Sequence, residues 1–169
     1  AVLKAARAVA VDGPDDGEIA VAARRGENEY MGVPCGIMDQ MAVALATPGT
    51  AMALDTRTLN YDLVALPQGY EMVVVHSGLT RKLTAGRYAA RKVECDAAKS
   101  FFGTEDLCLL DRATVEAADL DDVSMRRTLH CLTEHARVVD AVEAMRAGDM
   151  PAFGALMNAS HDSMRDWFE

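Results

Sequence analysis

The chain lacks several features that would assign it at once to a functional class. No stretch approaches the roughly 20 consecutive apolar residues of a membrane-spanning helix, so no membrane association is expected. Positive charge is also scarce, because 17 Lys and Arg stand against 26 Asp and Glu, a formal net charge of −9. A nucleic-acid backbone requires a basic face, so nucleic acid is not an expected partner. A phosphorylated small molecule stays compatible, since one metal ion or one loop can supply local positive charge.

Cysteine motifs, targeting signals and phosphate loops are missing too. The 4 cysteines form no C-x-x-C pair, which argues against a zinc site or a disulfide framework. Scattered thiols and the lack of a secretory signal in the first residues favour a reducing compartment, and we expect a cytoplasmic location. Neither a Walker loop nor a G-x-G-x-x-G motif is present, so any nucleotide loop would have to lie outside these residues.

The length of 169 residues fits one full domain or two small ones, and half of the residues are apolar. Both ends read as helix interiors without caps, which indicates an internal piece of a longer protein. Hydrophobic periodicity predicts an α+β fold: helices first, then three strands, then helices. The helices are expected over 1–12, 18–30, about 34–47, about 85–102, 122–147 and from 149 onward; the strands are expected over 50–55, 59–66 and 70–76.

Asp39 is the most unusual charged residue, because it falls in the first or second turn of a helix that is otherwise nearly all apolar. A helix N-terminus favours a carboxylate, and the preceding Gly36 would let a ligand approach the backbone closely. A carboxylate so placed can accept a hydroxyl proton as a general base. The alternatives are a buried Asp paired for structural reasons, or a carboxylate exposed at the surface in the first helical turn.

Glu27 lies near the end of the helix that precedes the one with Asp39, and a short connection brings such ends together. Two carboxylates can then share a Mg²⁺ ion and a hydroxyl group. The alternative is a solvated Glu at a charged helix end. Tyr88 falls in the first turns of a later helix, where its hydroxyl could reach a cleft. Its periodicity with Cys95 and Ala98 favours a core tyrosine instead.

Five segments, in this order and spacing, resemble motifs of the galactokinases, which belong to the GHMP family of small-molecule kinases. They are GENEYMGVPCGIMDQ, ALDTRTL, VVVHSGLTRKLTAGRYAARKVEC, RRTLHCLTEHARV and FGALMNASHDSMRD. The resemblance implies a GHMP-kinase-like architecture of two domains, of which this chain is an incomplete, central segment. Residues 1–69 would be the C-terminal part of the GHMP N-terminal domain, and residues 70–169 the N-terminal part of the C-terminal domain.

The resemblance also implies roles for single residues. Asp39 would be the general base that takes the proton from the anomeric hydroxyl of galactose, and Glu27 would bind Mg²⁺. Tyr88 would hydrogen-bond the sugar, and Gly36 would line its pocket. The reaction would convert ATP and galactose into ADP and galactose 1-phosphate, with ATP as co-substrate. In-line phosphoryl transfer asks the protein mainly for positioning and charge neutralisation, which fits this small residue set.

The chain also departs from the family pattern. The family's N-terminal sugar-recognition segment, its glycine- and serine-rich ATP loop and its late glycine-rich motif are not among these residues, so the segment alone is expected to be inactive. Ala89 and Pro34 stand where asparagines are usual. A non-catalytic sensor of sugar and ATP, or a kinase for N-acetylgalactosamine or arabinose, remains an alternative. The oligomeric state is open, with a monomer slightly favoured.

Overall fold

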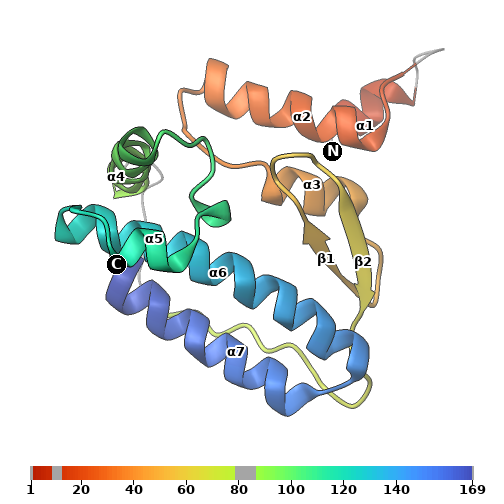
Figure 1. The fold of residues 1–169 in the computed structure, drawn as a ribbon. Helices are drawn as coiled ribbons and strands as arrows, with labels where there is room; N and C mark the ends of the chain where they lie inside the picture. The colour runs from red at the N-terminus through yellow and green to blue at the C-terminus, as the bar shows by residue number, and fades with distance from the viewer. Residues whose placement is uncertain (1, 9–12, 79–86, 169) are drawn as a thin grey trace. The chain divides into compact units, whose positions relative to one another are not determined.

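The computed structural model describes residues 2–8, 13–78 and 87–168 (Figure 1). The chain divides into two compact units, Ala1–Gln68 and Gly69–Glu169, and each is described by itself. Which domain of the GHMP kinases each unit corresponds to stays a prediction.

The first unit packs helices against a two-stranded hairpin. Its elements are α1 (Val2–Arg7), α2 (Asp16–Arg25), the π-helical turn η1 (Gly26–Tyr30), α3 (Met38–Leu45), β1 (Thr50–Leu54) and β2 (Tyr61–Ala65). β1 and β2 are antiparallel, from the pair Thr50 and Ala65 to the pair Leu54 and Tyr61. The buried core joins α2 to α3 and packs against the hairpin through Ala20, Ile37, Met41, Ala44, Met52, Leu54 and Leu59.

The second helix begins at Asp16, two residues earlier than its periodicity predicts. Asp15 caps it, because its Oδ1 accepts from the backbone N–H of Glu18 at 2.7 Å. Glu18 closes a capping box by accepting from the Asp15 N–H at 2.8 Å. The last residues of the predicted turn cluster therefore cap and begin α2 instead of extending the turn. The first predicted helix is described only as Val2–Arg7, because residues 9–12 lie outside the described part of the chain.

The third predicted strand, residues 70–76, is wrong in this structure: no strand is found at residues 70–77. Its apolar run from Met72 to Val75 has exposed fractions of 77–89%. A strand needs a neighbour to satisfy its backbone N–H and C=O groups. The described residues contain one sheet, and it holds only β1 and β2. The run therefore has the composition of a doubly covered strand but no described ladder partner.

The second unit is helical. Its elements are α4 (Arg87–Phe102), the 3₁₀ turn η2 (Leu107–Leu109), α5 (Arg112–Glu116), α6 (Asp122–Ala147), α7 (Met150–Ser163) and the π-helical turn η3 (Met164–Phe168). The prediction for residues 122–147 is confirmed, and Gly148 ends α6 in the left-handed conformation at φ 71°. Asp149 then caps α7, and α6 and α7 pack side by side (Figure 1). The short elements η2 and α5 were not predicted.

Arg127 anchors this second unit and is only 2% exposed. Its Nε lies 2.6 Å from Oε2 of Glu94 on α4. Its guanidinium also donates to the backbone carbonyl of Trp167 in η3 and lies over the Phe168 ring, 6.0 Å from the centroid. One α6 side chain therefore fixes both α4 and η3, which are far apart in sequence.

Acid is expected to weaken this unit through Glu94. The hydrogen bond from Arg127, against an opposing effect of burial, lowers the pKa of Glu94 below its ordinary value of 4.5. A depressed folded-state pKa gives stability that is complete above pH 4.5 and is lost as the pH falls through the folded-state value. Thermal unfolding measured from pH 7 to pH 3 should therefore show a steeper loss in the wild type than in Glu94→Gln. Equal slopes would contradict this role.

Among the described helices, none combines the length with the apolar character that crossing a bilayer requires.

Candidate active site

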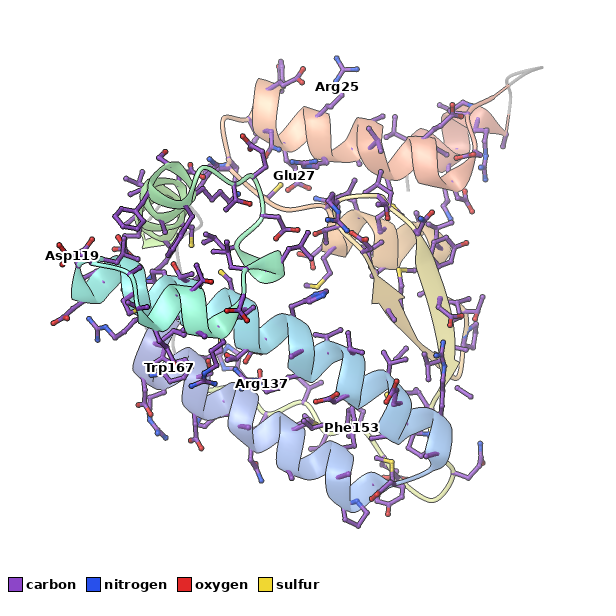
Figure 2. All side chains as sticks on the ribbon, viewed as in Figure 1. Arg25, Glu27, Asp119, Arg137, Phe153 and Trp167 are labelled. Atoms are coloured by element: carbon purple, nitrogen blue, oxygen red, sulfur yellow. The ribbon has the colours of Figure 1, made fainter. Side chains whose placement is uncertain are left out.

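Glu27 and Asp39 line one pocket in the first unit. The pocket has a volume of about 630 Å³ and is lined by α1, α2, η1 and α3. Glu27 lies in the π-helical turn that follows α2 (Figure 2), and Asp39 lies in the first turn of α3. The structure thus brings together the two carboxylates that the sequence placed at neighbouring helix ends.

A hydrogen-bond network holds Glu27 against the start of α3. Gln40, the residue after Asp39, donates from Nε2 to Oε1 of Glu27 at 3.0 Å. Cys35 donates from Sγ to Oε2 of Glu27 at 3.3 Å. Asn28 fixes the connection, because its Oδ1 accepts from the Cys35 backbone N–H at 2.9 Å. Both carboxylate oxygens of Glu27 are oriented by residues of the segment that leads into α3.

Sequence reasoning missed Asn28, Cys35 and Gln40 as positioning residues, although all three lie in the segment GENEYMGVPCGIMDQ. Burial raises the pKa of the Cys35 thiol, and the neighbouring Glu27 carboxylate raises it further. The thiol therefore stays protonated at neutral pH and can keep donating to Glu27. Polar side chains stand in the connection between η1 and α3 and at the start of α3, within reach of the Glu27 carboxylate. This spacing is the sequence signal that could have identified them.

Asp39 is exposed, which corresponds to the alternative of a surface carboxylate in the first helical turn. No hydrogen bond or ion pair joins its side chain to a described residue, so its oxygens are open to a ligand in the pocket. Ile37 at the helix N-cap supplies no side-chain cap, and the positive end of the α3 dipole favours an anion at Asp39. The Asp39 carboxylate needs no positively charged partner, because it is in contact with solvent.

Lys4 is a pocket residue that the sequence did not single out. Its Nζ donates to the Ala44 carbonyl at 2.9 Å and lies 3.4 Å from Oδ2 of Asp16. These contacts tie α1 to α2 and α3 and place one positive charge at the pocket wall. No sequence motif marks Lys4, because its position depends on how α1 folds back.

The other two predicted site residues are Gly36 and Tyr88. Gly36 is exposed and is not a lining residue, and a Cβ built on it would meet no atom within 4 Å. The backbone of Tyr88 belongs to α4 in the second unit, while its side chain lies outside what the structure describes. Their contacts with a sugar stay predictions.

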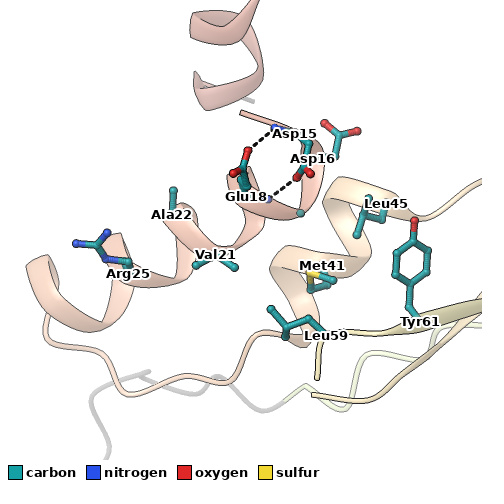
Figure 3. A pocket seen from close by; sticks show the side chains of 11 residues that line it. Asp15, Asp16, Glu18, Val21, Ala22, Arg25, Met41, Leu45, Leu59 and Tyr61 are labelled. Atoms are coloured by element: carbon teal, nitrogen blue, oxygen red, sulfur yellow. Dashed lines mark hydrogen bonds between the residues drawn. The ribbon is translucent and has the colours of Figure 1, made fainter. Parts of the chain in front are cut away.

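A second hollow of about 610 Å³ lies in the same unit, with a floor of Met41, Leu45 and Leu59 (Figure 3). Its rim is acidic, but the carboxylates there already have structural partners. Asp15 and Glu18 form the capping box described above, and Figure 3 draws its two hydrogen bonds as dashed lines. The carboxylates of the first pocket are the better candidates for chemistry, because Asp39 has no such partner among the described residues.

The donor set of the first pocket fits a hard cation. Mg²⁺ takes oxygen ligands and commonly only one or two protein carboxylates. Glu27 and Asp39 supply these, and Oε1 of Gln40 is buried without a hydrogen-bond partner among the described atoms. No group of three or more His, Cys, Asp or Glu side chains suited to a metal occurs in the described residues, so a site of the zinc type is not seen there.

No protein-family model matches the chain. A galactokinase of Glaesserella parasuis serovar 5 (strain SH0165) is 39% identical over 158 residues, which are 90% of this chain and 41% of the relative. A galactokinase of Actinobacillus pleuropneumoniae is 38% identical over 157 residues, with the same coverage of both chains. The chain thus spans about two-fifths of the length of the curated relatives that it matches.

The fold comparison agrees with the sequence comparison. The crystal structure of a Lactococcus lactis galactokinase complexed with galactose superposes with a TM-score of 0.86 at 30% sequence identity. The match covers 92% of this chain and 42% of that protein, and it confirms the predicted α+β, GHMP-kinase-like fold. Over about nine-tenths of its length, the chain is therefore similar to a segment that makes up about two-fifths of these galactokinases.

Proposed function

We propose that this chain supplies the general base and a metal-binding carboxylate of a galactokinase, which transfers a phosphoryl group from ATP to the anomeric hydroxyl of galactose. The observation that carries the proposal is the shared pocket of Glu27 and Asp39. The similarity to galactokinases across 90% of the chain supports the choice of reaction.

Asp39 would accept the proton of the anomeric hydroxyl. Its carboxylate is exposed, lines the pocket and has no competing partner among the described residues, so it is free to bond a sugar hydroxyl. As the hydroxyl oxygen attacks the terminal phosphorus of ATP, the proton would pass to a carboxylate oxygen. The dipole of α3 favours the anion that performs this step.

Glu27 would hold Mg²⁺, which neutralises the phosphate charge when it is bound. Gln40 and Cys35 fix both oxygens of Glu27 and so set the direction from which a cation can approach. Each oxygen keeps a second lone pair, because one hydrogen bond uses only one of them. Gly36 and Tyr88 would contact the sugar.

The function is tested by galactose-dependent ADP release from the natural gene product that contains these residues. A kinase releases ADP only when galactose is added. Binding of galactose and ATP without ADP release would instead support a non-catalytic sensor. Parallel assays with N-acetylgalactosamine and arabinose show which sugar is preferred, and a strong preference for either would overturn galactose as the substrate.

Replacing Glu27 by glutamine should raise the Mg²⁺ concentration for half-maximal rate by about tenfold or more, because the metal loses a charged ligand. Glu29→Gln is the matched control. Glu29 belongs to the same turn but pairs with Arg25 at 3.3 Å and does not line the pocket. An unchanged Mg²⁺ dependence in Glu27→Gln would contradict the metal role and leave that of Asp39 standing.

A further inference from the structure

Three of the four cysteines lie together in the second unit, and none of the three has a role in the proposed reaction. Cys95 belongs to α4, Cys131 to α6 and Cys108 to η2. These three elements pack against one another. All three thiols are partly exposed, so a small solute can reach them.

The packing of α4 on α6 brings Cys95 and Cys131 near one another. The ion pair between Glu94 and Arg127, at 2.6 Å, lies one residue before Cys95 and one helical turn before Cys131. It ties the facing sides of α4 and α6 together beside the two thiols. The two thiols are close enough for each to influence the ionisation of the other.

The surroundings favour ionisation of one thiol of this pair. The neighbouring Cys131 thiol lowers the pKa of Cys95 to about 7, against the opposing effect of burial. Lys99 and Arg127 lower it further, and Asp96 raises it. The neighbouring Cys95 thiol, together with burial, raises the pKa of Cys131. A thiolate beside a protonated thiol is the arrangement that reacts readily with oxidants.

The remaining cysteines are in less reactive settings. Burial raises the pKa of Cys108 to about 11, and Asp106 contributes to this effect. Cys35 lies in the first unit, where it is bonded to Glu27 and Asn28 and its pKa is raised. These two thiols therefore serve as internal references for the reactivity of the pair.

We propose that Cys95 and Cys131 form an oxidisable pair that closes a disulfide between α4 and α6 when the protein meets hydrogen peroxide. The Cys95 thiolate attacks one peroxide oxygen, the O–O bond breaks, and the hydroxide that leaves takes up a proton to become water. Cys95 is thereby oxidised to a sulfenic acid. The Cys131 sulfur then attacks the Cys95 sulfur, the S–S bond forms, and the sulfenic hydroxyl leaves with the Cys131 proton as a second water.

The test is peroxide titration of the natural gene product, followed by alkylation of the remaining thiols and peptide mass mapping. The expected result is a linked peptide pair containing residues 95 and 131, about 2 Da lighter than the sum of its reduced peptides. Dithiothreitol should separate it. A link through Cys108, or oxidation of Cys95 that stops at sulfinic or sulfonic acid, would overturn the proposal.

Two variants distinguish a disulfide between Cys95 and Cys131 from one that involves Cys108. Cys108→Ser should keep the linked peptide, whereas Cys131→Ser should lose it and leave a sulfenic acid on Cys95 that a dimedone probe captures. A second measurement needs no variant: a substoichiometric amount of iodoacetamide should label Cys95 before Cys35 and Cys108 in the wild type. Preferential labelling of Cys108 or Cys35 would contradict the assignment.

Discussion

Replacing Asp39 by asparagine is expected to reduce galactose-dependent turnover of the natural gene product by a factor of about 10² to 10⁴. Asparagine keeps the size of the side chain but cannot accept a proton from the anomeric hydroxyl. The loss should appear in kcat, with a smaller change in the KM for galactose, because proton transfer belongs to the transition state. Steady-state kinetics of ADP release provide the measurement.

Asp122→Asn is the matched control for this variant. Asp122 is also an exposed carboxylate in the first turn of a helix, α6, but it lines neither of the pockets described above. Its replacement should leave kcat within about twofold of the wild type. Turnover that survives in Asp39→Asn at the wild-type rate would remove the general base from the proposed mechanism.

Replacing Arg127 by methionine is expected to lower the free energy of unfolding of the second unit by about 3 kcal/mol. The variant removes the buried partner of Glu94 and the donor to the Trp167 carbonyl. The loss should lie at the low end for a buried pair, because Glu94 keeps Arg91 at 2.9 Å and is itself 25% exposed. Native-state hydrogen exchange of the α6 amides measures this effect directly.

Arg165→Met is the control for Arg127→Met. Arg165 also pairs with a carboxylate, that of Asp166 at 2.7 Å, but its side chain is 58% exposed. An exposed pair of this kind contributes about 0–1 kcal/mol, so exchange in α6 should hardly change. Equal protection losses in the two variants would show that burial of Arg127 does not decide its contribution.

Sequence patterns predict those parts of the fold that depend on interactions between residues close together in the chain. The helix over 122–147 and its end at Gly148 follow from an apolar stripe and a left-handed C-cap. The predicted strand at 70–76 fails for a different reason, because a strand forms only with a partner and the described residues offer none. Composition shows that a segment suits a covered strand, but it does not supply the neighbour.

The same division applies to the site. The short connection between two helix ends predicts that Glu27 and Asp39 approach one pocket, and the structure places both there. The bonds from Gln40 and Cys35 to Glu27 depend on the wide turn of η1, where the Met31 N–H reaches back to the Gly26 carbonyl at 3.1 Å. Periodicity does not predict such a turn, so these positioning contacts emerge only from the folded chain.

Phosphorus NMR of the reaction products shows whether the phosphoryl group of ATP reaches the anomeric oxygen of galactose. The natural gene product is incubated with galactose, ATP and Mg²⁺, beside its Asp39→Asn variant. We expect resonances of galactose 1-phosphate and ADP that grow together in the wild type and are nearly absent in the variant. A wild-type reaction that yields only ADP and inorganic phosphate, or a variant that forms the sugar phosphate at the full rate, would contradict it.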